Sequence, residues 1–290
     1  MKVLKRIGWF LVSMLPMLLA IIIQFAGVFA LMFFYAFQAM TEGANDGNAI
    51  IMSMYSKYLE NPLLAVLAYQ LIALPVFGIW YYFAYGRKKR AEGTQKPDGK
   101  NILTIVLAGV LLQILISCIL SLVYSIKPEL MQRYVDLMEA AGITEITWLS
   151  MLTTVILAPL VEELICRGII FRIAGKVSPG FWAANCIQAL AFGILHMNLV
   201  QGIYAFLLGL VLGYIYGKYR NIWICMLLHG VINLTSNYID YFFQIFPEKF
   251  EIPVYICCFV ISAFLLIVCY RFLGKIKPLE EDFKPGELDE

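Results

Sequence analysis

Long apolar runs without Asp, Glu, Lys or Arg follow one another along the chain, separated by short polar stretches. The runs are residues 7–37, 63–85, 102–125, 146–161, 177–217, 221–239 and 252–270. A helix that crosses the hydrocarbon core of a bilayer needs about 20 apolar residues, so each long run predicts a transmembrane helix. The pattern therefore predicts an all-α integral membrane protein.

Two of these runs have unusual lengths. The fourth run, residues 146–161, is too short to cross the membrane by itself, so its helix must continue through Glu162 and Glu163. The fifth run, residues 177–217, is long enough for two helices joined by a tight break, which we place at residues 196–202. Counted in this way, the chain has eight transmembrane helices.

Most of the basic residues lie in five short patches at the ends of the runs. The patches are Lys2, Lys5 and Arg6; residues 87–90 with Lys96 and Lys100; Arg172 with Lys176; Lys218 with Arg220; and Arg271 with Lys275 and Lys277. With eight helices all five patches fall on one side of the membrane, and the positive-inside rule assigns that side to the cytoplasm. Both termini are therefore predicted to be cytoplasmic.

Composition agrees with a membrane protein and excludes other classes. Of the 290 residues, 61% are hydrophobic and 14% charged, and the mean hydropathy is +0.79. Soluble domains are about half apolar and a quarter charged. A net charge of +2 without a basic stripe gives no indication of nucleic-acid binding. The seven cysteines form no C-x-x-C pair and six of them lie in these apolar runs, so a disulfide framework or thiolate metal site is not expected.

A few polar side chains inside the predicted helices are candidates for function, because an ionisable group in the membrane is costly unless it is paired or faces water. They are Glu162, Glu163, Arg167, His196, His229 and Asn233. The chain has only two histidines, and both belong to this set.

Their spacing suggests how they are oriented. Glu163 and Arg167 are separated by four residues and share a helix face, while Glu162 points roughly a hundred degrees away. One glutamate can thus be neutralised while the other faces a cavity and acts as a base. Phe192 and His196 share a face, as do His229 and Asn233, so an imidazole and an amide could hold a water or an oxyanion.

Each residue taken alone also has a structural explanation. Glu163 with Arg167 can be a buried clamp between helices, a histidine at a helix end can be a satisfied polar residue, and an asparagine can join helices by hydrogen bonds. The complete set, on three separate helices, favours catalysis.

The same residues resemble three ordered motifs of a known family. Residues 162–167 (EELICR), 192–196 (FGILH) and 229–233 (HGVIN) are similar to the EExxxR, FxxxH and HxxxN motifs of the CPBP family. That family comprises the CAAX prenyl endopeptidases of the Ras-converting type and the Abi proteins linked to bacteriocin self-immunity. The resemblance covers about a third of the chain, residues 146–233.

The resemblance implies an eight-helix fold with a peptidase site inside the bilayer. By position in the motifs, Glu162 would activate water, and His196 and His229 would orient it or stabilise the developing charge. Asn233 would support the oxyanion, while Glu163 and Arg167 would brace the fourth helix.

The resemblance leaves the metal question open, because family members are commonly labelled metalloproteases. Glu162, His196 and His229 are possible zinc ligands from separate helices, since no HExxH motif is present. A metal-free glutamate mechanism uses the same residues, and we favour it slightly. One difficulty is depth: His196 is expected at the outer end of its helix, whereas Glu162 and His229 lie near the middle or further inward.

We therefore predict an intramembrane endopeptidase of a bacterial plasma membrane, acting on a membrane-associated peptide or protein, with a prenylated CAAX-type substrate as one option. Residues 1–145 would hold the first three helices, residues 146–273 the catalytic core, and residues 274–290 a charged cytoplasmic tail. Two other functions fit the polar residues. One is a non-enzymatic immunity or scaffold protein of the same fold, and the other is a proton-coupled transporter, although no inverted repeat supports the latter.

Overall fold

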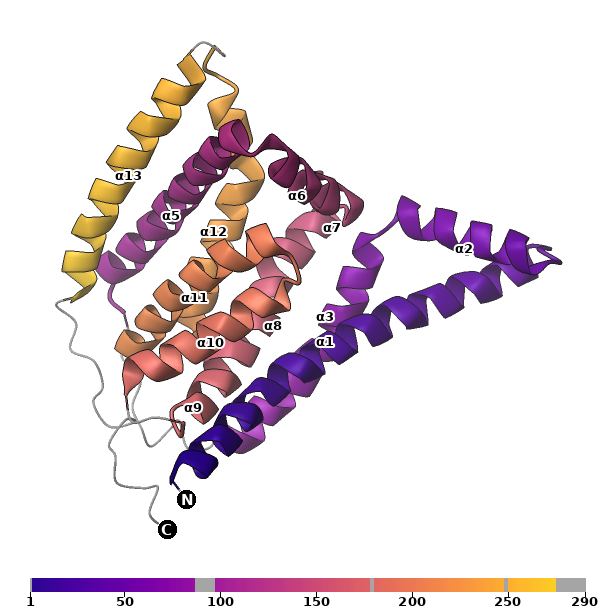
Figure 1. Ribbon diagram of the computed structural model, residues 1–290, viewed down its shortest axis with the longest axis horizontal. Coiled ribbons are helices and arrows are strands. Elements are labelled where there is room, and N and C mark those ends of the chain that lie inside the picture. Colours follow the sequence, from indigo (N-terminus) through magenta and orange to yellow (C-terminus); the bar gives the residue numbers. More distant parts are fainter. Residues whose placement is uncertain (1, 87–96, 178–179, 248–249, 275–290) are drawn as a thin grey trace.

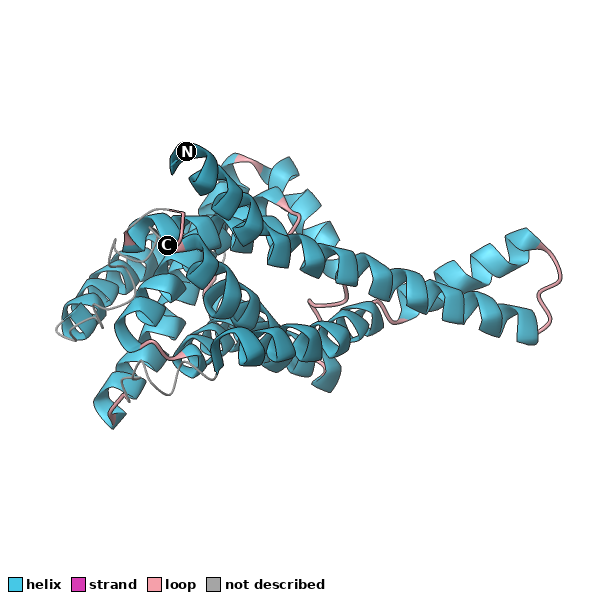
Figure 2. Cartoon of the chain, turned by 90° about the horizontal axis from the view of Figure 1, so that it is seen from below, coloured by secondary structure: helices cyan, strands magenta, loops and turns pink. Residues whose placement is uncertain are grey.

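The computed structural model describes residues 2–86, 97–177, 180–247 and 250–274, and these residues form helices with short connections and no strand (Figures 1 and 2). In chain order, with η marking a π-helix, the helices are α1 (Lys2–Thr41), α2 (Gly47–Glu60), α3 (Leu63–Tyr81), η1 (Tyr82–Gly86), α5 (Gly99–Ile126), α6 (Pro128–Ala140), α7 (Trp148–Met151), η2 (Leu152–Leu157), α8 (Ala158–Glu163), η3 (Leu164–Ile170), α9 (Phe171–Ala174), α10 (Phe181–Leu195), α11 (Leu199–Tyr219), α12 (Ile222–Phe243) and α13 (Glu251–Gly274). The all-α prediction is confirmed.

The predicted number of eight complete membrane helices is not confirmed. In the described part of the chain, seven helices are long and apolar enough to cross a bilayer: Val3–Thr41, Leu63–Tyr85, Gly99–Ile126, Trp148–Ala174, Leu199–Tyr219, Ile222–Phe243 and Glu251–Gly274. The remaining predicted span corresponds to α10, which has only 15 residues. At 1.5 Å per residue α10 is about 22 Å long, shorter than a hydrocarbon core of about 30 Å.

The helix that carries both glutamates is one continuous rod, Trp148–Ala174, built from α7, η2, α8, η3 and α9. We call it the composite helix. The fourth apolar run does continue through Glu162 and Glu163, as its length predicts. Two segments of the rod are π-helical, a conformation that is rare in proteins and frequent at functional sites.

The short helix α10 packs closely against α11, and glycines of α11 make this possible. A Cβ added to Gly209 would lie 2.9 Å from the Ala189 Cα, and one added to Gly213 would overlap the side-chain oxygen of Asn185. Small residues four apart are the usual means by which membrane helices approach closely. The α10–α11 hairpin, residues 181–219, is therefore a tightly packed unit beside the composite helix (Figure 1).

An arm projects away from the rest of the helices (Figure 1). It consists of the C-terminal part of α1, a helix of 40 residues, and of α2, which has no buried residue and lies alongside α1 (Figures 1 and 2). At 1.5 Å per residue α1 is about 60 Å long, roughly twice the thickness of a hydrocarbon core. The apolar runs did not predict α2.

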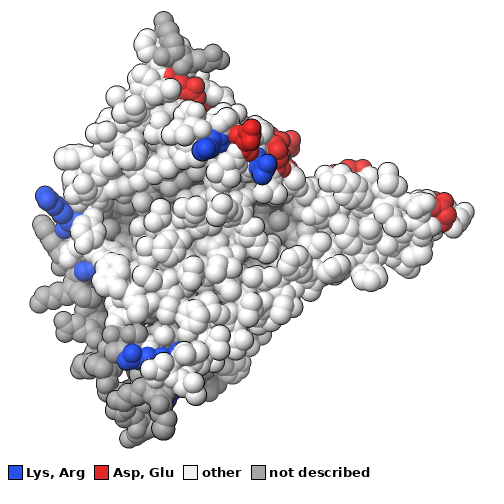
Figure 3. All heavy atoms as spheres, viewed as in Figure 1, with Lys and Arg blue, Asp and Glu red and all other residues white. Residues whose placement is uncertain are grey.

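The surface charges are unevenly distributed. Figure 3 shows Lys and Arg along the left edge and at the lower left, and Asp and Glu at the top and along the upper right, where some basic side chains lie beside them. This asymmetry has the form that the positive-inside rule requires, and the assignment of the basic end to the cytoplasm stays a prediction. Residues 87–90, Lys96, Lys275, Lys277 and nearly all of the predicted tail at 274–290 lie outside the described residues.

Candidate active site in the helical core

Glu163 and Arg167 form a buried ion pair on the composite helix. An Nη atom of Arg167 donates to Glu163 Oε1 over 2.8 Å, and neither side chain has any exposed surface. The other Nη atom of Arg167 donates to the Gly209 carbonyl of α11 over 3.1 Å, and the guanidinium lies 4.8 Å from the centre of the Phe192 ring. The predicted pair is thus present, and Arg167 connects the composite helix to both helices of the α10–α11 hairpin.

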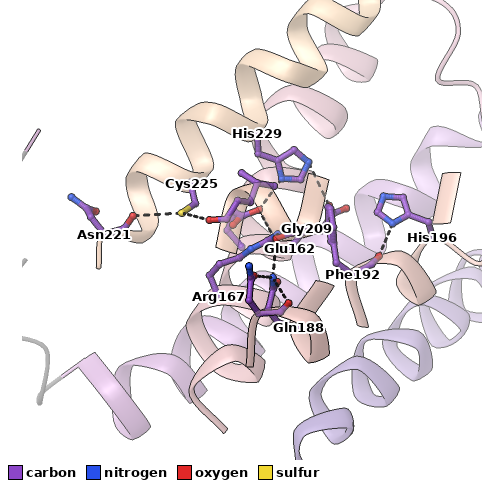
Figure 4. A network of polar contacts seen from close by, with 12 residues as sticks. Glu162, Arg167, Gln188, Phe192, His196, Gly209, Asn221, Cys225 and His229 are labelled. Carbon is purple, nitrogen blue, oxygen red and sulfur yellow. Dashed lines mark hydrogen bonds and ion pairs between the residues drawn. The ribbon is translucent and has the colours of Figure 1, made fainter. Parts of the chain in front are cut away.

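His229 of α12 lies between the two adjacent glutamates (Figure 4). Its Nδ1 is 3.0 Å from Glu163 Oε1, and its Nε2 is 3.7 Å from Glu162 Oε2. Because an ionised carboxylate only accepts hydrogen bonds, His229 Nδ1 carries the hydrogen of the shorter contact. The longer separation exceeds a direct hydrogen bond and suits two groups that share a water molecule.

The two glutamates differ in burial as well as in partners. The side chain of Glu162 is 21% exposed, whereas that of Glu163 is fully buried. Glu163 is held by a cation and an imidazole, while Glu162 lies at the longer distance from the same imidazole. This is the division between one neutralised and one accessible carboxylate that the sequence predicts.

His196 stands apart from this group. Its Nδ1 lies 2.8 Å from the Phe192 carbonyl, which can only accept, so Nδ1 carries a hydrogen here too. The Phe192 ring contacts both imidazoles edge-on, with centroid distances of 5.0 Å to His196 and 5.6 Å to His229. Figure 4 places His196 on the far side of Phe192 from Glu162. Of the two histidines, His229 is therefore the one that lies beside the Glu162 carboxylate.

α10 is short enough to end near the site. His196 follows its last residue, about 22 Å along the helix from Phe181. The Phe192 ring contacts the imidazoles of both His196 and His229, so His196 lies close to the site although it is at the end of its helix.

Asn233 lies one turn after His229, but its amide is directed to the backbone. Asn233 Nδ2 donates to the Thr154 carbonyl of the composite helix over 2.8 Å. The amide group that was predicted to support an oxyanion thus has a backbone partner in this structure.

Two buried amides of α10 were not predicted. Gln188 Nε2 donates to the Gly209 carbonyl over 2.8 Å and to Asn185 Oδ1 over 2.7 Å, and Asn185 Nδ2 donates to the Leu210 carbonyl over 3.0 Å. The Gly209 carbonyl therefore receives both Gln188 and Arg167 (Figure 4). The G-x-x-x-G-x-x-x-G pattern at residues 209–217 is the signal that could have located this contact.

The possible zinc site is not assembled. Within the described ranges, no group of three or more His, Cys, Asp or Glu side chains is placed to hold a metal ion. Zinc ligands lie about 2.0–2.3 Å from the ion and so converge closely, whereas His196 is separated from Glu162 and His229 by Phe192. The arrangement does not fit a Glu162–His196–His229 ligand set.

Residues 144–235 match the family model of the type II CAAX prenyl endopeptidases, described as Rce1-like. The matched segment contains all six candidate polar residues, from Glu162 to Asn233. The match confirms the resemblance that the three motifs predict. No curated protein and no solved structure matches the chain.

Proposed function

On the premise that residues 144–235 are of the Rce1-like type, we propose that this protein is an intramembrane endopeptidase with Glu162 as its general base. The observation that carries the proposal is the pair of adjacent carboxylates around His229. Glu163 is buried and ion-paired, while Glu162 is partly exposed and free to take a proton. A general base must be reachable by water and substrate, and of the two glutamates Glu162 meets that condition.

The chemistry starts from a water molecule between Glu162 Oε2 and His229 Nε2, which are 3.7 Å apart. Glu162 takes one proton from this water, and the oxygen attacks the carbonyl carbon of the scissile peptide bond. The C–N bond then breaks, and the proton on Glu162 passes to the leaving nitrogen. The products are an amine and a carboxylic acid that keeps the second proton of the water until it ionises in solution, and Glu162 is regenerated.

The buried ion pair supports this step without touching the substrate. Glu163 accepts from His229 Nδ1 and so fixes the ring with Nε2 directed toward the water. Arg167 offsets the charge of Glu163 and ties it to α11 through the Gly209 carbonyl. The catalytic role of His196 stays a prediction, since its hydrogen bond goes to the Phe192 carbonyl.

The substrate of the proposed reaction is a membrane-associated peptide or protein. The family match supports a CAAX-type sequence as the first to test, in prenylated and unprenylated forms.

Glu162→Gln tests the proposal, because glutamine keeps the size of the side chain but cannot accept the proton. Purified variant and wild type should be incubated with CAAX-type and unrelated membrane peptides, and cleavage followed by mass spectrometry. We expect a loss of about 10²–10⁴-fold in rate with an unchanged melting temperature. Glu129→Gln, on the exposed start of α6, is the matched control and should retain full activity.

Cleavage that persists at the wild-type rate in Glu162→Gln would contradict the assignment of the base. A biological function that survives this substitution would instead support the non-enzymatic immunity or scaffold alternative.

A further inference from the structure

The N-terminal half of the composite helix contains a backbone carbonyl that is left without a hydrogen-bond donor in its own helix. In η2 the Ala158 N–H donates to the Thr153 carbonyl, five residues back. The Thr154 carbonyl would take its hydrogen from residue 158 in an α-helix and from residue 159 in a π-helix. Ala158 is already engaged with Thr153, and Pro159 has no N–H. Thr154 is thus left without a donor at either position.

A side chain of α12 supplies the missing hydrogen. Asn233 Nδ2 donates to the Thr154 carbonyl over 2.8 Å. Gly230, three residues earlier on α12, allows the close approach, because a Cβ at that position would lie 3.1 Å from the Val155 carbonyl. Proline also crowds the carbonyl four residues before it, which for Pro159 is that of Val155. Gly230 and Asn233 therefore face the two carbonyls that Pro159 disturbs.

A second amide acts on the neighbouring carbonyl from a different helix. Gln70 of α3 is 3% exposed, and its Nε2 donates to the Thr153 carbonyl over 2.9 Å. Two consecutive carbonyls of η2 are thus held by carboxamides from α3 and α12. In a membrane a backbone group that loses its partner has little water to replace it, so these contacts constrain the local conformation strongly.

We propose that Asn233 and Gln70 are positioning residues. Their hydrogen bonds fix the conformation of η2 next to Pro159 and thereby orient the side chain of Glu162, which lies three residues after Pro159 on the composite helix. In this assignment the Asn233 amide serves the Thr154 carbonyl. The positioning effect on catalysis rests on the proposed role of Glu162, whereas the hydrogen bond between Asn233 and the orphaned carbonyl can be tested without any activity.

The test is a double-mutant cycle between Pro159 and Asn233. In Pro159→Ala, residue 159 regains an N–H that can serve Thr154, so Asn233 should become less necessary. Asn233→Ala should lower the melting temperature in detergent by about 2–4 °C in the wild-type background, as expected for one buried hydrogen bond. In the Pro159→Ala background the same change should lower it by less than half as much.

The cycle is repeated on kcat with a cleaved peptide. Loss of an oxyanion donor would cost the same factor, about 10²–10³, in both backgrounds. Loss of a positioning group should cost a smaller factor once Pro159 is replaced. Equal losses in the two backgrounds, in melting temperature or in kcat, would overturn the assignment.

A variant of Gln70 provides a second test, which does not require Pro159→Ala to fold. Gln70→Leu should lower kcat with little change in KM, because the side chain acts on the conformation of η2. The control is Gln113→Leu on α5, where a buried amide donates to the Ser117 hydroxyl over 3.1 Å, and it should leave kcat unchanged. A wild-type kcat in Gln70→Leu would also overturn the proposal. If Glu162 proves not to be the base, the melting-temperature cycle still tests the hydrogen bond between Asn233 and the Thr154 carbonyl.

Discussion

Two ion pairs of similar length lie in contrasting parts of the molecule. Arg167 and Glu163 meet at 2.8 Å in the helical core, and Lys57 and Glu42 meet at 2.6 Å on the arm. Both side chains of the first pair are fully buried, whereas those of Lys57 and Glu42 are 20% and 53% exposed. The shorter pair is the one exposed to solvent, so distance alone does not show which pair the fold depends on.

The difference follows from what replaces a lost partner. At an exposed site water solvates the remaining charge, and such pairs contribute little to stability. At a buried site the remaining charge has no such replacement, and breaking the pair is costly even though forming it gained little. The core is therefore expected to be sensitive to single substitutions, and the arm tolerant of them.

The largest effect on stability is expected from Arg167→Ala, which leaves Glu163 buried without its cation. The free energy of unfolding should fall by about 3–5 kcal/mol, measured by thermal or denaturant unfolding in detergent. A joint Glu163→Gln/Arg167→Met change removes both charges and should recover part of the loss. If Arg167→Ala has the same melting temperature as the wild type, the core is no more sensitive to the loss of an ion pair than the arm.

The next effect separates two histidines within the core. His229 contacts both glutamates, while His196 is bonded to the Phe192 carbonyl. His229→Ala should lower kcat by about 10²-fold or more, in the range of a positioned acid–base group. His196→Ala should lower it less, and an equal or larger loss for His196 would show that the ring moves past Phe192 to join the site during turnover.

A smaller effect tests the close packing of the α10–α11 hairpin. Gly213→Ala places a methyl group against Asn185, and overpacking of this kind typically costs about 1–3 kcal/mol. Gly78→Ala in α3 is the matched control, since a Cβ there meets nothing within 4 Å. The melting temperature should fall for Gly213→Ala and not for Gly78→Ala, and equal melting temperatures would mean that the hairpin can relax.

The sequence predicted the helices and the buried ion pair because both depend on local spacing. Runs of apolar residues determine where membrane helices form, and a separation of four residues places Glu163 beside Arg167. The break between α10 and α11 lies at residues 196–198, within the predicted break at residues 196–202. The short length of α10 was not predicted, because the charge-free run at residues 177–217 gives no sign that its first helix begins only at Phe181. The arm helix α2 was not predicted because its apolar residues do not form a long run.

Contacts between helices were the least predictable part of the site. Asn233 shares a face with His229, as predicted, yet its partner is decided by a proline on another helix and by the π-helical register around it. The separation of His196 from Glu162 depends on where the Phe192 ring lies. Neither fact is contained in the spacing of residues along one helix.

The smallest effect is expected on the arm. Lys57→Ala removes the cation from Glu42 but leaves a carboxylate that water can solvate, so the melting temperature should stay close to that of the wild type. The hydrogen bond from Lys57 is the main cause that lowers the pKa of Glu42 below its ordinary value of 4.5. A lowered carboxyl pKa stabilises the fold above the ordinary pKa, and this contribution is lost as the pH falls through the lowered value. In Lys57→Ala the pKa of Glu42, followed by NMR titration, should return toward 4.5 while stability near neutral pH hardly changes. A clear drop in melting temperature for Lys57→Ala would show that the arm is held as firmly as the core, and that burial is not what distinguishes the two pairs.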